Sequence, residues 1–245
     1  QVVDTMARAG VAARAVDPAT FDRKDVDVLV LAGPLAPPDA TLVTWLADQR
    51  AAGVSLIMLL PGARYRASSG DIVGLENGEE AYLGPLGLTR DARLLVDRAS
   101  LVDFQVPSQT GGASTPLPIA AEVSRVHETL ALFAAGTGTA LPMAGSLRAT
   151  PGSATVRPIA WSRAGAVSAT LPTDATVRAL EETAPPAATG SPRGMIFAAD
   201  PSPPSGRLLI FSSNLGLTSM SLQQLLVRLD LTQAPDVLAQ KLKAY

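Results

Sequence analysis

The chain has 245 residues, of which 47% are hydrophobic and 17% are charged, and its net charge at pH 7 is -2. This length and composition allow a large buried core, whereas the near-neutral charge excludes the basic surface on which nucleic-acid binding depends. The sequence has no cysteine and one histidine. Disulfides, cysteine nucleophiles and metal sites built from several cysteines or histidines are therefore excluded.

The N-terminal pattern predicts a helix over residues 1–10 and a strand over residues 11–16. The sequence begins with Gln1 rather than methionine and shows no signal peptide. No apolar run reaches the roughly 18 residues needed to cross a bilayer. We therefore interpret the chain as the soluble portion of a longer protein whose targeting or membrane segments lie outside it.

Two short apolar runs, residues 25–34 and 53–62, follow, and each ends at glycine and proline. Unbroken runs of this kind are typical of strands buried on both faces of a parallel sheet. Between them, Asp39 is a suitable helix N-cap, and residues 42–47 carry apolar side chains at helical spacing. The pattern predicts a strand–helix–strand unit with parallel strands.

Turn residues follow three of the predicted strands at their carboxyl ends, where ligands usually bind in an open α/β sheet. Such turns can present backbone N–H groups to a ligand or a partner, although glycine and proline can also serve only to turn the chain. We expect a ligand or partner edge made by Gly33, Pro34, Pro61, Gly62, Ser213 and Asn214.

Beyond residue 62 the pattern is less regular, and we expect long inserted loops at about 63–80 and 105–120. The local pattern predicts a short helix over 81–88 and strands over 92–97, 156–162 and 166–171, whereas 122–133 suits a helix or a strand equally. The last third predicts a hairpin of strands 194–199 and 207–212, then helices over 219–229 and 235–242.

These elements predict an α/β fold of the flavodoxin-like or Rossmann-like type. Its sheet is expected to be mainly parallel and flanked by helices, with additional β-hairpin strands in the C-terminal half. Residues 1–230 are expected to form a single domain, and residues 231–245 a helical extension toward a membrane segment outside the chain.

Catalytic motifs are absent from the sequence. No lysine follows a glycine as in a phosphate-binding loop, and no Gly-x-Ser-x-Gly elbow occurs. His127 could act only with Ser124 or Ser162, and nothing in the spacing supports such a triad, so a structural histidine is the simpler interpretation. The acidic pairs are interpreted as solvated charges: Asp25 with Asp27, and Glu79 with Glu80. We predict no enzymatic activity, no catalytic residue, no metal and no cofactor.

Several short motifs, in order along the chain, resemble one family. The stretch 26–62 contains Ala32-Gly33-Pro34 and the run from Gly53 to Pro61. Further matching segments are 86–97, His127-Glu128-Thr129, 142–147, 158–162 and 206–214. Together they resemble the extracytoplasmic domain of auxiliary components of ABC transport systems, the gliding-motility accessory (GldG-like) family, which is related to an intraflagellar-transport-type α/β fold.

The chain departs from that family at two places. Glu128 stands where the family usually has proline, and Phe211-Ser212-Ser213 stands where it has an acidic Gly-Asp-Ser turn. The second departure puts a ligand role for that turn in doubt.

The resemblance implies a non-catalytic domain on the outer, periplasmic face of the bacterial inner membrane. Its partners would be the permease and ATPase subunits of an ABC transport system, linked to gliding motility or export, and its membrane attachment would lie outside this chain. The alternative is a small-molecule or glycan binding α/β module of a membrane-anchored protein. An α/β domain of the von Willebrand-type proteins is a related possibility, whereas a glutamine-amidotransferase-like enzyme would need the cysteine that is absent.

Overall fold

A computed structural model describes residues 12–34, 36–66, 71–97, 102–106, 113–117, 120–126, 140–152, 156–169, 191–199 and 204–213. Within these residues the helical elements are η1 Pro18–Thr20, η2 Arg23–Asp25, α2 Ala40–Ala51, α3 Glu80–Leu83 and η3 Gly84–Leu86. The strands are β1 Val28–Ala32, β2 Ser55–Leu59, β3 Ala63–Arg66, β4 Asp71–Gly74, β5 Leu88–Ala92, β6 Leu95–Val96, β7 Val102–Val106, β8 Ala113–Leu117, β9 Ala120–Val126, β10 Ala140–Pro142, β11 Ser146–Ala149, β12 Arg157–Ser162, β13 Val167–Ser168, β14 Gly194–Ala199 and β15 Leu208–Phe211.

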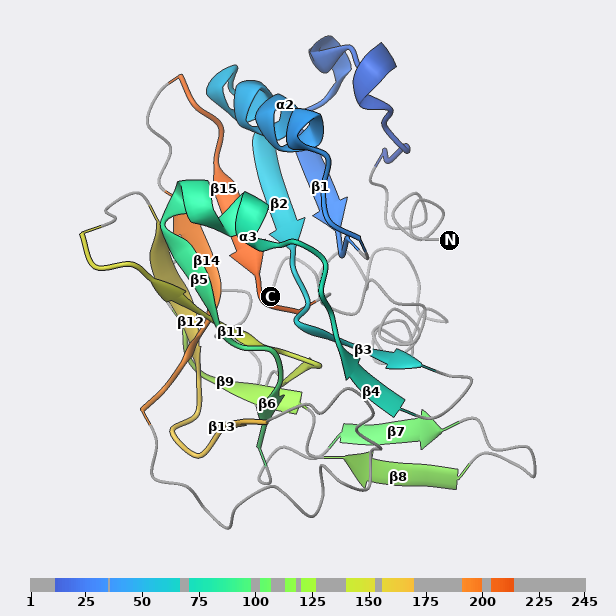
Figure 1. Cartoon of the computed structure of the whole chain (residues 1–245), viewed down its shortest axis with the longest axis vertical. Helices are drawn as coiled ribbons and strands as arrows, with labels where there is room; N and C mark the ends of the chain where they lie inside the picture. Colours follow the sequence, from blue (N-terminus) through green and yellow to red (C-terminus); the bar gives the residue numbers. More distant parts are fainter. Residues whose placement is uncertain are drawn as a thin grey trace, which may run out of the picture.

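A nine-stranded mixed sheet forms the body of the described structure (Figure 1). Its main path runs β1-β2-β15-β14-β12-β9-β10, and β11 joins β5 to β14 beside that path. Strand β15 lies between β2 and β14, so the end of the described chain is inserted next to its first strand–helix–strand unit. Three two-stranded sheets lie apart from it: β3 with β4, β6 with β13, and β7 with β8.

The flavodoxin-like or Rossmann-like prediction is wrong. In the described sheet only the pairs β1–β2 and β2–β15 are parallel, and the remaining strand pairs are antiparallel. The physical reason lies in the connections, because a parallel pair needs a crossover of a dozen or more residues. The segment between β1 and β2 supplies such a crossover, whereas only eight residues separate β14 from β15, which pair antiparallel. The described residues contain two α-helices, α2 and α3, and both pack on one face of the sheet.

The predicted strand–helix–strand unit is confirmed. Strands β1 and β2 pair in parallel, with Val30 opposite Ile57, and α2 joins them. Asp39 is the N-cap of α2, since its side chain accepts a hydrogen bond of 3.0 Å from the backbone N–H of Thr41. This interaction holds the pKa of Asp39 below its ordinary value. The predicted hairpin is also confirmed, because β14 and β15 pair antiparallel.

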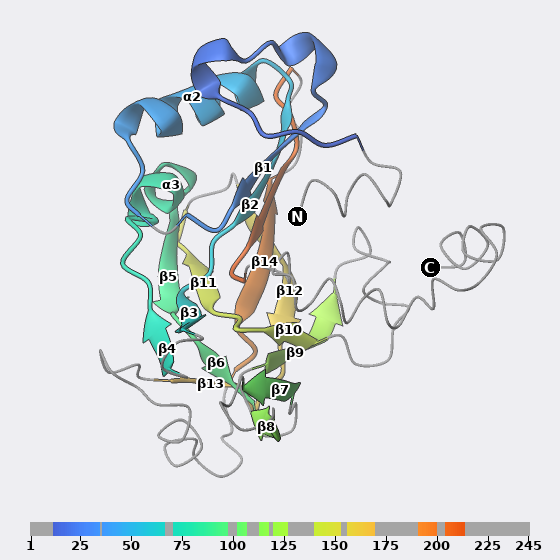
Figure 2. The ribbon, with the colours of Figure 1, turned by 90° about the vertical axis from the view of Figure 1, so that its right-hand side faces the viewer.

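The two faces of the sheet carry different rows of side chains, and α2 and α3 pack on one of them. Alternate strand residues point to opposite faces, and one face carries the rows Leu29–Leu56–Leu208 and Leu31–Met58–Ile210. Leu46 of α2 and Tyr82 and Leu83 of α3 pack on this face, and both helices lie on the same side of the strands in Figure 2. The opposite face carries the row Val30–Ile57–Leu209.

Several predicted loops and strands are corrected by the structure. The predicted loop 63–80 contains the hairpin β3–β4, and the predicted loop 105–120 overlaps the hairpin β7–β8. Residues 12–16 form no strand. The ambiguous segment 122–133 begins as strand β9, which reaches Val126.

The helices predicted over 219–229 and 235–242, and the extension 231–245, lie outside the described residues. Within the described part of the chain, no helix has the length and hydropathy of a membrane span.

Candidate functional site

The structure brings the predicted turn residues to one edge of the sheet. Because β1, β2 and β15 are parallel, Ala32, Leu59 and Phe211 are neighbours in register, and the residues after them meet. Gly33 has a φ of +57° and donates its N–H to the carbonyl of Leu59 at 2.9 Å. Of the predicted edge, Gly33, Pro34, Pro61, Gly62 and Ser213 are placed here, and Asn214 lies outside the described residues.

At the ends of β2 and β15 this edge is filled, whereas Gly33 and Pro34 after β1 are half-buried. Pro61 and Gly62 are buried, and Ser213 has an exposed fraction of 0%. A Cβ atom at Gly62 would lie 2.4 Å from the carbonyl oxygen of Arg93, so the backbone of β5 and its extension approaches too closely for any side chain. The burial of these turns leaves no open cleft between Pro61, Gly62 and Ser213.

A buried ion pair closes the edge on the side of α3. Arg90 of β5 donates from Nε to Oε1 of Glu79 at 2.8 Å and from Nη2 to Oε2 of the same carboxylate. The side chains are 7% and 1% exposed respectively. Nη2 of Arg90 also donates to the carbonyl of Leu60 at 2.7 Å, which ties the ion pair to the end of β2.

Two further side chains donate hydrogen bonds to backbone carbonyls near this edge. Asn77 donates from Nδ2 to the carbonyl of Pro34 at 3.0 Å, and Arg93 donates to the carbonyl of Leu75. The N–H of Leu75 in turn donates to the carbonyl of Gly62 at 2.9 Å. The loop before α3 therefore lies against the carboxyl ends of both β1 and β2.

Three buried polar atoms in this region have no hydrogen-bond partner among the described residues: Oδ1 of Asn77, the hydroxyl of Tyr82 and Nη1 of Arg90. Burial raises the pKa of the Tyr82 phenol, because the charged form is disfavoured away from water.

On the other side of the edge, Ser212 and Gly145 are linked in both directions. The hydroxyl of Ser212 donates to the carbonyl of Gly145 at 2.6 Å, and the N–H of Gly145 donates to the carbonyl of Ser212 at 2.8 Å. Ser212 is 0% exposed. The hydroxyl is thus a structural donor that joins the turn before β11 to the end of β15.

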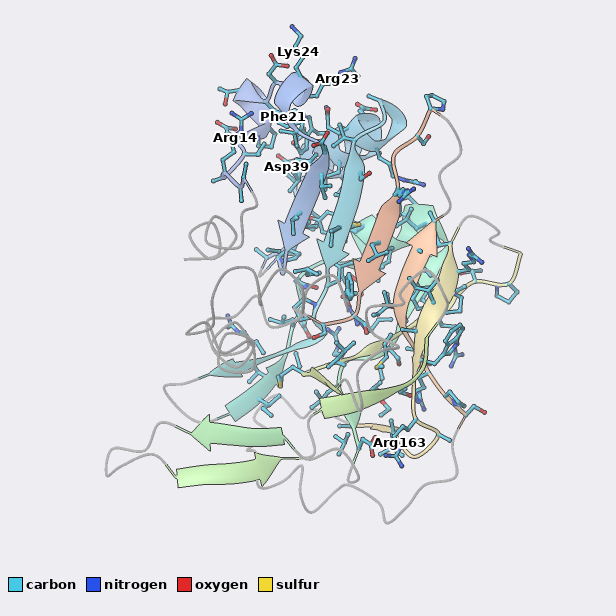
Figure 3. All side chains as sticks on the ribbon, turned by 180° about the vertical axis from the view of Figure 1, so that it is seen from behind. Arg14, Phe21, Arg23, Lys24, Asp39 and Arg163 are labelled. Carbon is cyan, nitrogen blue, oxygen red and sulfur yellow. The ribbon has the colours of Figure 1, made fainter. Side chains whose placement is uncertain are left out.

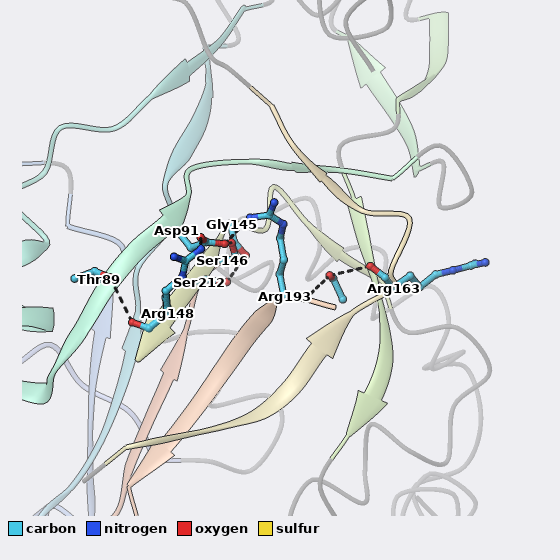
Figure 4. A network of polar contacts seen from close by, with 9 residues as sticks. Thr89, Asp91, Gly145, Ser146, Arg148, Arg163, Arg193 and Ser212 are labelled. Atoms are coloured by element: carbon cyan, nitrogen blue, oxygen red, sulfur yellow. Dashed lines mark hydrogen bonds and ion pairs between the residues drawn. The ribbon is translucent and has the colours of Figure 1, made fainter. Parts of the chain in front are cut away.

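A second polar cluster surrounds Asp91 on β5 (Figure 4). Its carboxylate accepts hydrogen bonds from the hydroxyl of Ser146, at 3.0 Å, and from the guanidinium groups of Arg148 and Arg193. Burial raises the pKa of Asp91, but the hydrogen bond from Ser146 and the hydrogen bonds and charges of the two arginines outweigh it and hold the pKa below 3.8. The carboxylate is therefore a weak base, ill suited to activate the adjacent Ser146.

A surface pocket of about 410 Å³ lies at the opposite, amino end of the parallel strands. Phe21 and Arg23 appear there beyond the start of β1 in Figure 3. Phe21 packs edge-on against Trp45 of α2, with ring centroids 5.1 Å apart. The pocket is lined by Phe21, Asp22, Arg23, Asp48, Gln49 and Ala52.

The remaining sequence candidates are not brought into one site. Ser162 is buried, and its hydroxyl donates to the carbonyl of Arg163 and accepts from the N–H of Arg193. His127 lies outside the described residues, and Asp27 is exposed at the start of β1. Within the described part of the chain, no group of three or more histidine, cysteine, aspartate or glutamate side chains could hold a metal ion.

Sequence reasoning missed the residues that close the edge. The sequence pattern predicts a solvated charge at Glu79, yet Glu79 is 1% exposed and paired with Arg90. The two lie eleven positions apart along the chain and on different elements, so no helical or strand spacing indicates the pair. Asn77 and Arg93 carry no motif either.

No family model matches the sequence, and no curated protein is significantly similar to it. Among solved structures, the chain is similar to the "mmIFT52 N-terminal domain", with a TM-score of 0.55 and 12% sequence identity. The likeness covers 96% of this chain and 91% of that domain. At this level of identity it concerns the fold alone. It supports the expected intraflagellar-transport-type α/β fold and offers no support for the gliding-motility accessory family. The chain is therefore, in its fold, an α/β domain similar to the mmIFT52 N-terminal domain.

Proposed function

We propose that this chain is a non-catalytic, partner-binding domain of a membrane ABC transport system of the gliding-motility accessory type. The proposal places it on the extracytoplasmic face of the bacterial inner membrane, in one complex with the permease and ATPase subunits of the same system. The short motifs between residues 26 and 214 that resemble this family motivate the assignment.

The filled edge is the observation that carries the proposal. In open α/β sheets the carboxyl ends of parallel strands usually bind the ligand, but here Pro61, Gly62 and Ser213 are buried. The polar side chains next to them are engaged with protein groups, as Glu79 with Arg90 and Ser212 with Gly145. The buried turns and the paired polar groups at this edge stabilise the domain and leave little room for a small molecule. This favours a partner-binding function over a small-molecule binding function.

Affinity purification of the full-length protein from its own host tests the proposal. The protein is extracted in mild detergent and the co-purifying proteins are quantified by mass spectrometry. Recovery of an ABC ATPase and permease in stoichiometric amounts, and of this protein when the ATPase is tagged instead, is the expected result. A second membrane-anchored protein of the same host, carrying the same tag, is the control for nonspecific capture.

Recovery of the protein without transporter subunits would contradict the proposal and favour the small-molecule or glycan binding alternative. That alternative is then tested with a glycan array and with thermal-shift screening. The pocket beside Phe21 and Asp48 would be the first region to examine, since the carboxyl edge is filled.

A further inference from the structure

Asn77 and Gly78 are consecutive residues of the loop before α3, and the structure requires both residue types there. Asn77 donates from Nδ2 to the carbonyl of Pro34 at 3.0 Å, which ties this loop to the end of β1. Gly78 has a φ of +62°, and a Cβ atom at its position would lie 2.8 Å from Cβ of Pro37 and 2.9 Å from Cα of the same residue. A left-handed backbone packed this closely favours glycine. The fold therefore maintains the dipeptide Asn-Gly.

The dipeptide Asn-Gly is chemically labile, because glycine has no side chain to hinder attack by its own nitrogen on the preceding amide. A base removes the N–H proton of Gly78, the nitrogen forms a bond to Cγ of Asn77, and the Cγ–Nδ2 bond breaks with release of ammonia. Water then opens the resulting succinimide ring. Opening at Cγ leaves aspartate, and opening at the backbone carbonyl leaves isoaspartate.

The folded state opposes this reaction. Asn77 is 1% exposed, so water and base have little access to its amide. The bond to Pro34 restricts rotation of the side chain. Because Oδ1 of Asn77 has no hydrogen-bond partner among the described residues, that one bond orients the amide. The reaction therefore requires a local opening of the loop, and the frequency of such openings depends on local stability.

Interactions on both sides of Asn77 resist that opening. The N–H of Leu75 donates to the carbonyl of Gly62 at 2.9 Å. On the other side, the carboxylate of Glu79 is held by Nε of Arg90 at 2.8 Å. Weakening of the buried ion pair should therefore expose the amide of Asn77 more often.

We propose that Asn77 is a deamidation site protected by the fold, and that its conversion releases the loop before α3 from the end of β1. This inference goes beyond the proposed partner-binding function and does not depend on it. The aspartate product is a carboxylate, which has no proton to donate to the carbonyl of Pro34. It also places a negative charge two positions from the buried Glu79. Isoaspartate lengthens the main chain, which the close packing of Gly78 opposes.

The test measures the conversion of each asparagine in the full chain by peptide mapping with mass spectrometry. The protein is incubated at mildly alkaline pH, both folded and in urea, and is digested at acid pH to preserve the remaining amides. The other asparagine of the chain, Asn214, precedes a leucine that hinders attack, so its slow conversion in urea is the internal reference. We expect Asn77 to convert at least about tenfold more slowly in the folded protein than in urea, about 1.4 kcal/mol of protection.

Two variants test the role of the ion pair. In the folded protein, Glu79→Gln should accelerate conversion of Asn77 at least about tenfold, whereas Glu80→Gln, at the exposed neighbour, should leave the rate unchanged. The rate of each variant in urea corrects for any effect of the substitution on the reaction itself.

A third variant, Asn77→Asp, reproduces the aspartate product. Hydrogen exchange measured by NMR should be faster at Leu75, whose N–H bonds to Gly62 beside the loop. Exchange should be unchanged at Leu56, whose N–H donates to the carbonyl of Arg207 within the sheet at 2.8 Å.

The comparison of folded and unfolded protein needs no variant, so it remains decisive if a substitution prevents folding. Equal conversion of Asn77 in the two states, or no conversion in urea, would overturn the inference. Equal folded-state rates for Glu79→Gln and Glu80→Gln would contradict the requirement for loop opening, and unchanged exchange at Leu75 in Asn77→Asp would contradict release of the loop. The proposed partner-binding function is tested separately by the affinity purification.

Discussion

Glu79 and Arg90 form a two-point ion pair in which Nε of Arg90 lies 2.8 Å from Oε1 of Glu79 and Nη2 bonds to Oε2. Both side chains are buried, and Arg90 also binds the carbonyl of Leu60 at the end of β2. The pair therefore connects the loop before α3, strand β5 and the carboxyl end of β2. It occupies the region where an open α/β sheet would otherwise offer a ligand site.

Removal of the charge at Glu79 should destabilise the domain strongly. Glu79→Gln leaves the buried guanidinium of Arg90 without a counter-charge, and loss of one partner of a buried pair typically costs about 3 kcal/mol or more. Urea unfolding followed by circular dichroism measures the change in the free energy of unfolding. The matched control is Glu80→Gln, because Glu80 is the exposed neighbour and surface substitutions usually stay within about 0.5 kcal/mol. Equal free energies of unfolding for Glu79→Gln and Glu80→Gln would show that the ion pair does not contribute to the stability of the domain.

Replacement of Gly62 by alanine should also destabilise the domain. The added Cβ would lie 2.4 Å from the carbonyl oxygen of Arg93, so the backbone must shift, and overpacking of this kind costs about 1–3 kcal/mol. Ala51→Ser is the control, since Ala51 is exposed at the end of α2 and surface substitutions usually stay within about 0.5 kcal/mol. A clear fall in Tm for Gly62→Ala and little change for Ala51→Ser is expected. The reverse order would contradict the close approach at this edge.

The Asp91 cluster should make stability depend on pH in the acid range. Its interactions hold the pKa of folded Asp91 below the ordinary 3.8, so the unfolded chain takes up the proton first as the pH falls. The stabilisation is complete above that ordinary value and is lost as the pH falls through the lower pKa of the folded state. The free energy of unfolding, measured with denaturant at pH 6 and at pH 3, should fall less between these two pH values for Asp91→Asn than for the unmodified protein. The exposed Asp48→Asn should leave the loss unchanged.

The N-terminus of α2 should open more often when its cap is removed. Asp39→Ala eliminates the acceptor for the Thr41 N–H, whereas Asp39→Asn retains an oxygen at the same place and is an equally good N-cap. Hydrogen exchange measured by NMR should be faster at Thr41 in the alanine variant and close to normal in the asparagine variant. Equally fast exchange in both variants would mean that charge, rather than the hydrogen bond, holds the cap.

The sequence by itself determined the local elements. Apolar runs that end at glycine and proline, the cap at Asp39 and the helical spacing after it identified β1, α2 and β2 and their parallel order. The two strong strands near residues 194–199 and 207–212 identified the hairpin β14–β15. In both cases the pattern and its connection lie within about 35 residues, where backbone propensity and loop length decide the outcome.

Only the tertiary structure decided the order and direction of the strands in the sheet and the burial of the turns at its carboxyl edge. The insertion of β15 between β2 and β14, and the antiparallel direction of most of the sheet, depend on pairings between segments far apart in the chain. The burial of Glu79 against Arg90 depends on the same long-range packing. A strand's sequence reveals which side chains favour burial, but not which neighbour covers them, because that choice follows from the packing of the whole chain.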